Sequence, residues 1–497
     1  MWDGSSALLV GILVGPAVTA LAALAVGRRR PRLAGRLGAG TAALGFLGAA
    51  ALAVGATGGA SVSIGAGDHP MLVVGADRLA VVLLLLVYGV SAIVQTFAIR
   101  YLAEDDRAGW FSAGAGLLTG ASATLMTAGT LVVLGVGWTA SGVALCLLLA
   151  TYWRLPSARD GVRRTALAFL IGDLALWSAI VLIAASRGTV TLAACLMVVA
   201  ALSRSAQVPF HRWLPATLAA PTPVSALLHA GVVNAGGVLL VKLSPLVTAA
   251  GPAQALIIVA GTATLAFGAV VMMVKPDVKG ALAHSTMAQM GFMILTCGLG
   301  LWAAAVFHLV AHGFYKATLF LSSGSAIAYR RRKRALPPAA PRRRGVIAAL
   351  LLPAAAIALA LIAVPMTPGD HTAEWALLIF AWVTGAAATK GWLARRPGTG
   401  GVLGAAAFLL PATLGYVWLV ATVSGFLAPS LPAPALPTTA TWLIAGAALA
   451  LLGGLAAAVR TSGAGRLQRA LYVRALTAGH IAPPPPSLPT QLTGARS

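Results

Sequence analysis

The chain has 497 residues, of which 59% are hydrophobic and only 9% are charged. A water-soluble protein carries charges on roughly a quarter of its residues, so this composition excludes a soluble globular protein and predicts a polytopic membrane protein. The 35 Lys and Arg residues outnumber the 11 Asp and Glu residues, which gives a net charge of +24. The basic residues form short clusters between apolar runs, which is typical of membrane topology and not of nucleic-acid binding.

The first apolar run precedes its basic cluster at 28–30 and has no convincing cleavage site, so we expect a retained membrane span and not a secretory signal. The three cysteines lie far apart within apolar runs and have no metal-ligand spacing. They are interpreted as small buried hydrophobic residues, without a disulfide framework.

Apolar runs of about twenty residues, the length that crosses a bilayer, recur along the chain. The predicted spans, about fifteen in all, cover residues 7–26, 37–56, 73–98, 109–127, 129–150, 165–185, 189–209, 223–245, 253–274, 280–300, 302–328, 345–365, 373–392, 402–427 and 439–459. We therefore expect an all-α fold, a polytopic membrane helix bundle with about 14–15 transmembrane helices. Each half contains a span with buried basic residues, and inverted repeats are common in transporters.

If these spans alternate in direction, the basic clusters all fall on one side of the membrane. The clusters lie at 28–36, 100–107, 154–164, 275–279, 330–344, 395–396 and 460–474. The positive-inside rule assigns this side to the cytoplasm, which predicts an external N-terminus and a cytoplasmic C-terminus. The connector at 330–344 is expected to be a cytoplasmic loop, with contact to anionic lipid head groups as the alternative.

The stretch 203–242 combines charged residues with prolines in apolar sequence. Arg204, His229 and Lys242 lie inside or beside apolar runs. Four prolines separate two of these runs: Pro209, Pro215, Pro221 and Pro223. A charge at membrane depth normally faces a protein interior or a wet cavity, and a proline opens the helical backbone there. The combination predicts broken helices and a translocation pathway, although His229 alone could be an ordinary core histidine.

Asp173 is the only carboxylate well inside an apolar run. A lone buried carboxylate needs a cationic partner or a proton. A structural ion pair and a proton relay both remain open, and either one requires an inward-facing side chain.

His308, His312 and Lys316 recur every fourth residue, so they share one helix face over roughly 12 Å. A neutral histidine both donates and accepts a hydrogen bond, and a desolvated lysine can release its proton. We therefore predict a proton relay whose members face polar groups inside the bundle. Structural hydrogen bonding is one alternative. A zinc site is another, but no Glu follows the first His as in the HExxH motif, and no third ligand is evident.

Lys279 opens the span that precedes the helix face with His308, His312 and Lys316, which we call the ladder. A lysine at a cytoplasmic helix end is usually a snorkelling anchor, and the residues alone favour that interpretation.

Several segments together resemble the proton-translocating, antiporter-like subunits of respiratory complex I and their relatives. They are SAQVPFHRWLP followed by APTPVSALLHAG, then DVKGALAHSTMAQMGFM and FHLVAHGFYKATLFLSSGS. ADRLAVVLLLLV and the GD at Asp173 also fit, so the resemblance covers about residues 70 to 330. It implies that Lys279, His308, His312 and Lys316, together with His229, belong to a proton pathway.

The sequence departs from the family pattern at three positions of the proton pathway. Thr139 stands where the family has a fifth-span glutamate, Arg204 stands where it has a seventh-span lysine, and the twelfth span has no lysine. Threonine carries no titratable charge and arginine does not lose its proton in proteins. The usual exchange between Glu and Lys therefore cannot operate here. With no glutamate left in the fifth span, we expect Asp173 to pair with Arg204.

These departures make the chain look like a divergent branch, the DabB-type subunits of inorganic-carbon uptake complexes. HAGVVNAGG, SRSAQ and LSSGS are similar to that branch. The resemblance implies a partner of the DabA type, which is related to zinc carbonic anhydrases, and coupling of H+ or Na+ flow to trapping of CO2 as bicarbonate. The alternatives are a proton-pumping subunit like subunit L of NADH-quinone oxidoreductase or a membrane hydrogenase, an Mrp-type cation/proton antiporter subunit, and a membrane scaffold without transport.

No flavin, iron–sulfur, nucleotide or quinone motif is evident, so we expect no cofactor, no metal and no catalysis by this chain alone. The expected location is the bacterial cytoplasmic membrane. We expect N-terminal transmembrane helices at 1–108, an antiporter-like proton-conducting core at 109–393, C-terminal transmembrane helices at 394–480 and a disordered Pro-rich tail at 481–497.

Overall fold

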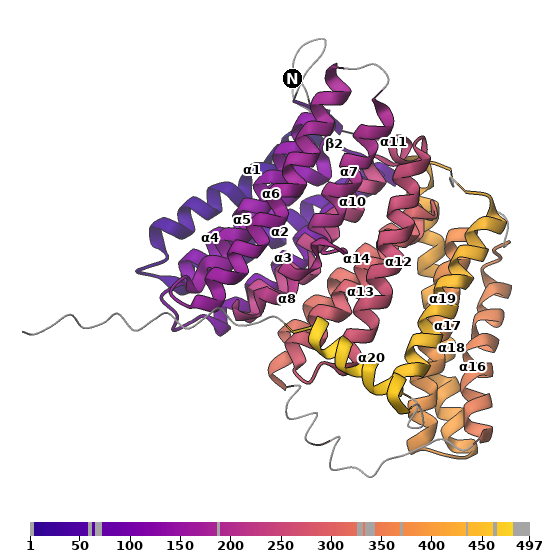
Figure 1. Cartoon of the computed structure of the whole chain (residues 1–497). Coiled ribbons are helices and arrows are strands. Elements are labelled where there is room, and N and C mark those ends of the chain that lie inside the picture. Colours follow the sequence, from indigo (N-terminus) through magenta and orange to yellow (C-terminus); the bar gives the residue numbers. More distant parts are fainter. Residues whose placement is uncertain are drawn as a thin grey trace, which may run out of the picture.

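The computed structural model of the protein describes residues 4–57, 62–64, 72–185, 189–325, 332, 343–367, 371–433, 436–460 and 465–480. Within these ranges the chain is a bundle of helices (Figure 1). Two short strands, β1 (Val62–Ile64) and β2 (Val74–Ala76), pair in antiparallel fashion, which the sequence did not predict.

The helices of the first half are α1 (Gly4–Val26), α2 (Pro31–Thr57), α3 (Arg78–Tyr101), α4 (Ala108–Thr127), α5 (Leu131–Leu149), α6 (Pro156–Ala185), α7 (Val190–Arg204) and α8 (Trp213–Ala216). Those that follow are α9 (Thr222–Ala230), α10 (Ala235–Lys242), α11 (Ser244–Thr248), α12 (Gly251–Val274), α13 (Val278–Gly298) and α14 (Trp302–Leu321). The last group is α16 (Arg343–Ala363), α17 (Thr372–Arg395), α18 (Thr399–Leu427), α19 (Thr438–Arg460) and α20 (Gly465–Ala478).

Among the described residues, 12 helices are long and apolar enough to cross a membrane, counting α9 and α10 as one segment from Thr222 to Lys242. The helices α4 and α13 have 20 and 21 residues, and α7 is a shorter apolar helix. Each predicted span therefore coincides with a helix, and the prediction of an all-α, multi-pass membrane bundle is confirmed.

Two helices are interrupted inside the bundle, and the prolines predicted the first of these breaks. The helix α7 ends at Arg204, and a turn and short helical pieces lead from there to α9. The second interruption separates α9 from α10 at Gly231, where a single 3-10 turn (Val232–Asn234) joins them. Backbone groups freed by such breaks need new partners inside a membrane protein. Ser205 provides one, because its hydroxyl donates to the carbonyl oxygen of Val233 over 2.6 Å.

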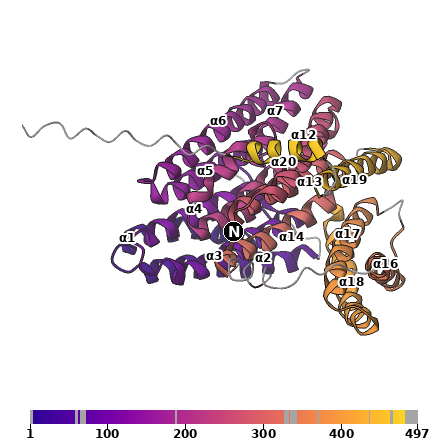
Figure 2. The same cartoon turned by 60° about the horizontal axis from the view of Figure 1, so that its bottom comes forward.

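The helix α14 occupies the middle of the molecule (Figures 1 and 2). It contacts α3, α9, α10 and α13 on the side of the first half, and α17 and α18 on the other side. The helices α16 to α19 form the orange and yellow group beyond it. This central position brings the face of α14 that carries the histidines and the lysine against the interrupted segment α9–α10.

Basic loops collect at one end of the bundle. Residues of three connections, including Arg28, Arg100 and Arg154, line one surface basin of about 1410 Å³. Three of the predicted basic clusters therefore share one side, as alternating spans require. Which side faces the cytoplasm stays a prediction, as does the division of the chain into four segments. The predicted tail at 481–497 and nearly all of the loop at 330–344 lie outside the described residues.

The helix α20 was not predicted. It has 14 residues, so it is about 21 Å long at 1.5 Å per residue and too short to cross a bilayer. It lies across the end of α12 (Figures 1 and 2). Ala475 is buried there among Val271 and Val274, whereas Arg466, Arg469 and Arg474 are exposed.

Ala475→Glu should release α20 from α12, because a carboxylate buried among Val271 and Val274 is costly. We expect faster tryptic cleavage at Arg466 and Arg469 in the purified protein, measured by mass spectrometry of the fragments. Ala478→Glu is the matched control, since Ala478 is exposed on the same helix. Equal cleavage rates for the two variants would show that Ala475 does not hold α20 in place.

Candidate ion pathway

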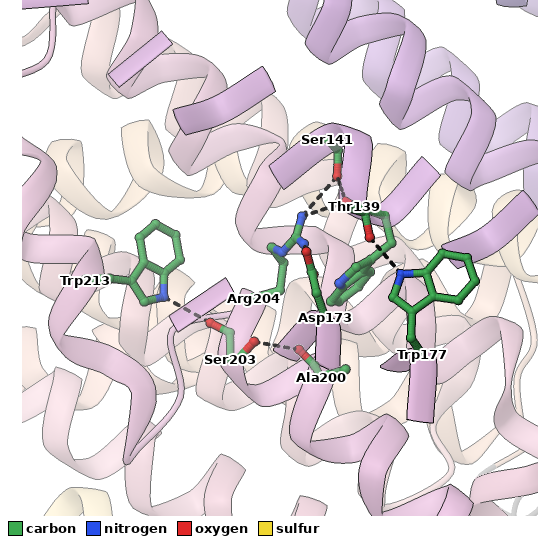
Figure 3. Close-up of polar contacts among 9 residues, drawn as sticks. Thr139, Ser141, Asp173, Trp177, Ala200, Ser203, Arg204 and Trp213 are labelled. Atoms are coloured by element: carbon green, nitrogen blue, oxygen red, sulfur yellow. Dashed lines mark hydrogen bonds and ion pairs between the residues drawn. The ribbon is translucent and has the colours of Figure 1, made fainter. Parts of the chain in front are cut away.

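Arg204 is the last residue of α7, and its side chain is completely buried. Its Nη2 lies 2.9 Å from Oδ1 of Asp173 on α6, so the expected pairing is confirmed (Figure 3). Its Nη1 donates to the Ser141 hydroxyl over 3.0 Å and to the carbonyl oxygen of Trp138 over 3.1 Å. Two nitrogens of the guanidinium are therefore satisfied by groups from α5 and α6.

Aromatic rings hold the same guanidinium from its faces. The Cζ atom of Arg204 is 4.3 Å from the ring centroid of Trp138 and 4.1 Å from that of Phe169, within the range of cation–π attraction. Gly142 provides the space, because a Cβ atom there would lie 3.0 Å from Nη2. The site is thus built for a planar cation that keeps one position and one charge.

Thr139 belongs to the same turn of α5 but has a different partner. Its hydroxyl accepts a hydrogen bond from the indole nitrogen of Trp177 over 3.1 Å (Figure 3). The family resemblance predicts a glutamate at this position. Here the position holds a neutral hydroxyl that is hydrogen-bonded to α6.

The ladder of His308, His312 and Lys316 on α14 faces the interior of the bundle, where the His308 ring packs against Phe292 of α13 and His312. His312 and Lys316 are buried, with exposed fractions of 3% and 0%, and His308 is half-buried. The rings of His308 and His312 stack with centroids 5.6 Å apart. Lys316 donates from Nζ to the Ser285 hydroxyl over 3.0 Å and to the carbonyl oxygen of Leu282 over 3.4 Å. Lys316 therefore lies against α13 and has neutral oxygen partners.

His229 extends this cluster to the interrupted segment. It is completely buried at the end of α9, and its Nδ1 lies 3.2 Å from the Thr286 hydroxyl of α13. Its ring stacks on Phe320 of α14 at 4.2 Å. Thr286 is adjacent to Ser285, the partner of Lys316, and Phe320 is one turn from Lys316 on α14. Helices α9, α13 and α14 thus bring together three of the predicted pathway residues.

Several nitrogens in this cluster have no hydrogen-bond partner among the described residues. They are Nε2 of His229, Nε2 of His308 and both ring nitrogens of His312. Buried polar atoms are nearly always paired, so such exceptions mark functional groups or sites that water fills. In the described ranges, no three His, Cys, Asp or Glu side chains are grouped as metal ligands would be.

Lys279 lies at the start of α13, and its Nζ donates to the carbonyl oxygen of Ala220 over 3.3 Å. This carbonyl directly precedes Pro221, where α9 is about to begin. The ammonium therefore contacts the loop that leads to His229.

The structure thus separates the predicted residues into two sets. Arg204 and Asp173 form an ion pair held by α5, α6 and α7, whereas His229, Lys279, His308, His312 and Lys316 gather around α9, α13 and α14. The sequence analysis missed the hydroxyl partners Ser141, Ser285 and Thr286. Ser285 and Thr286 directly follow His284 inside an apolar span. That run of polar residues could have identified them from the sequence as candidate hydrogen-bond partners.

Comparisons with known proteins show which family the chain matches. Residues 128–394, more than half of the chain, match the family described as NADH:quinone oxidoreductase/Mrp antiporter, TM. The chain is 37% identical over 274 residues to a probable inorganic carbon transporter subunit, DabB1, of Halothiobacillus neapolitanus, which covers 50% of this chain and 49% of that protein. It is also 37% identical over 271 residues to NADH-quinone oxidoreductase subunit L of Mycobacterium tuberculosis, covering 50% and 43% of the two chains.

The chain therefore spans about half the length of the curated relatives it matches. Among solved structures, the Mrp complex from Dietzia sp. is similar, with a TM-score of 0.59, 26% identity, and coverage of 95% of this chain and 52% of that one. The archaeal membrane-bound sulfane sulfur reductase shares the fold at a TM-score of 0.59 and 17% identity, over 89% and 98% of the chains.

Asp173→Asn should destabilise the protein, because it leaves the buried guanidinium of Arg204 without a counter-charge. We expect a loss of about 2–3 kcal/mol, below the full effect of breaking a buried pair, since the Asp173 side chain is 18% exposed. The lowered midpoint of thermal unfolding in detergent measures this loss.

The control is Asp160→Asn, also on α6, whose carboxylate pairs with Arg164 over 2.7 Å at positions 21% and 31% exposed. The two carboxylates are similarly accessible, but Arg164 is partly exposed whereas Arg204 is fully buried, so the loss here should be only about 0–1 kcal/mol. Unfolding midpoints that fall equally for both variants would contradict a special role of Asp173 beside Arg204.

Proposed function

The chain belongs to the NADH:quinone oxidoreductase/Mrp antiporter transmembrane family, and we propose that it is the ion-conducting subunit of an inorganic-carbon uptake complex. Protons are the proposed ion, and His229, Lys279, His308, His312 and Lys316 are their proposed pathway. In this proposal the subunit couples proton flow to the trapping of CO2 as bicarbonate by a partner, and it does no redox chemistry itself.

One observation carries the proposed proton conduction. Lys316 is completely buried, and its hydrogen-bond partners among the described residues are a hydroxyl and a carbonyl oxygen. A charged ammonium without a carboxylate is costly at membrane depth, while the neutral amine is tolerated there. Lys316 can therefore alternate between the two forms, and His312 beside it can pass the proton on because imidazole donates and accepts.

The Arg204–Asp173 pair favours a subunit of a carbon-uptake complex over a subunit of a redox-driven pump. A pump of the complex I type is expected to move protons by exchange between a glutamate and a lysine, and this chain has a threonine and an arginine at those positions. An arginine that keeps its proton and contacts two aromatic rings cannot serve as a relay. The proposed path is accordingly shorter: it enters from one side and ends at a partner subunit.

The proposed partner is a DabA-like protein related to zinc carbonic anhydrases. Support comes from the DabB relatives of Halothiobacillus neapolitanus and of Bacillus subtilis, the latter 33% identical over 270 residues. The equal identity to subunit L of Mycobacterium tuberculosis keeps a proton-pumping subunit as the second candidate. The proposed location is the bacterial cytoplasmic membrane, with the N-terminus outside.

Lys316→Ala and His312→Ala should each abolish growth at low CO2 in a strain that depends on this chain and its DabA-like partner. The complex should still assemble, as judged by co-purification of the two subunits. Lys390→Ala is the control, because Lys390 is exposed on α17. Normal growth of both ladder variants would show that the ladder is structural, and redox-driven pumping without the partner would favour the second candidate.

A further inference from the structure

A second group of polar side chains lies buried among α1, α2, α3 and α4, apart from the pathway described above. Gln95 and Ser91 on α3 and Thr119 on α4 have exposed fractions of 2%, 1% and 4%. Gln95 Nε2 donates to the Ser91 hydroxyl over 2.9 Å, and the Ser91 and Thr119 hydroxyls are 2.7 Å apart. Three neutral polar groups are thus joined inside the membrane-spanning part, where the pathway residues do not reach.

Cavities lie on both sides of Thr119. One has about 10 Å³ and is lined by Gln95 and Thr119 together with Thr19 and Thr41, whose hydroxyls are 2.7 Å apart. The other has about 40 Å³, and its polar lining comes from Ser91, Thr119, Ser122, Ser141 and Asn234. A polar cavity of roughly 10–15 Å³ holds one water molecule, so the larger one has room for two or three.

Each cavity contains a buried polar atom without a protein partner among the described residues. Oε1 of Gln95 is one, and Oδ1 of Asn234 is the other. Leaving such an atom unpaired is costly, and a water molecule in the adjoining cavity would pair it. Gly38 keeps the space for Gln95, because a Cβ atom at Gly38 would clash with Oε1. Each cavity therefore offers polar partners to a water molecule at one part of its wall, while the rest of the larger cavity, including Leu118, Leu125 and Val238, is apolar.

Further cavities and polar groups lie on either side of these two cavities. Toward the interior, Ser141 lines the larger cavity and also accepts a hydrogen bond from Arg204. Toward the basic end, a third cavity of about 10 Å³ is lined by Gly35 and Ser112. Gly35 is one helical turn from Gly38 on α2. This third cavity shares Pro31 and Ala103 with the large surface basin.

We propose that Gln95, Ser91, Thr119 and Ser122, here called the α1–α4 file, form a water-filled route by which protons pass between the basic end of the bundle and the cavity beside Arg204. The inference rests on the proposed proton conduction and adds an entry route to it. Arg204 does not block this route electrostatically, because Asp173 lies 2.9 Å from it and balances its charge.

The transfer step needs no residue that changes its charge permanently. A hydrated proton gives its proton to a hydroxyl oxygen of the file, and the proton of that hydroxyl passes to the next oxygen or water. One O–H bond forms and one breaks at each station, and rotation of the hydroxyl restores the starting state. Serine and threonine suit this role because a hydroxyl donates one hydrogen bond and accepts on two lone pairs.

The first test compares two threonines of α4 in the assembled complex in proteoliposomes, with a pH-sensitive dye inside. Thr119→Val removes the hydroxyl that both cavities share, while Ser91 still receives the hydrogen bond from Gln95. The Thr119 and Thr124 hydroxyls each donate to a carbonyl of their own helix, at Ala115 over 2.7 Å and at Gly120 over 3.0 Å. Thr124→Val is the matched control, because Thr124 lines neither cavity. We expect Thr119→Val to slow proton flux after a pH jump about tenfold, as a barrier higher by 1.4 kcal/mol would, and Thr124→Val to leave it unchanged.

Lys316→Ala, measured in the same assay, separates this inference from the proposed function. If Lys316→Ala abolishes the flux while Thr119→Val conducts like the wild type, the file is overturned and the α14 ladder stands. If Lys316→Ala also conducts like the wild type, the proposed function is overturned.

The second test asks for water in the file and does not depend on proton flux. Ser122→Cys is made in a variant in which Cys146, Cys195 and Cys297 are replaced by serine. We expect aqueous Ag+ to react with the new thiol, as measured by loss of subsequent maleimide labelling in denaturant. Adding Gly38→Ala, which crowds Gln95, should slow the reaction. A thiol at position 122 that stays unreactive with Ag+ would overturn the hydrated file.

Discussion

Two cations, Arg204 and Lys316, lie inside this membrane-embedded bundle, and the cost of removing charge from water constrains the structure around them. Arg204 is stabilised by a carboxylate, a hydroxyl, a backbone carbonyl and two aromatic faces. Lys316 has a hydroxyl and a carbonyl oxygen instead. The difference follows from chemistry: a guanidinium keeps its charge and needs full compensation, whereas an amine can remain buried by giving up its proton. One cation is fixed in place, and the other is left free to exchange.

The interrupted helices make both arrangements possible. Because α7 ends at Arg204, the guanidinium reaches α5 and α6 at the point where the backbone turns away. Because α9 stops at Ala230, His229 comes to lie at a helix end against Phe320 and Thr286. Open backbone at membrane depth is tolerated only where protein or water satisfies it, and Ser205 and Asn234 both donate to backbone carbonyls near the second break. The same breaks that interrupt the backbone hydrogen bonds of these helices therefore bring polar groups to the centre of the bundle.

The sequence predicted those features that depend on one helix or on one strong energetic term. Span lengths, the internal face of α14 at His312 and Lys316, and the Arg204–Asp173 pair follow from hydrophobic length, helical spacing and the cost of an unpaired charge. Contacts between helices that involve no such charge could not be predicted, because they depend on register and crossing geometry that no single span encodes. Examples of such contacts are Ser285 beside Lys316, Trp177 beside Thr139, and the packing of α20 on α12.

The central claim is that Lys316 exchanges its proton while Arg204 does not. Solid-state NMR of the complex in lipid bilayers, with 15N-labelled lysine and arginine side chains, tests this directly as the pH is varied on both sides. The Lys316 resonance, assigned by its loss in Lys316→Ala, should move between the ammonium and the neutral amine positions, and the Arg204 resonances should stay at the guanidinium position. A Lys316 resonance that remains at the ammonium position at every pH at which the protein stays folded would contradict the account.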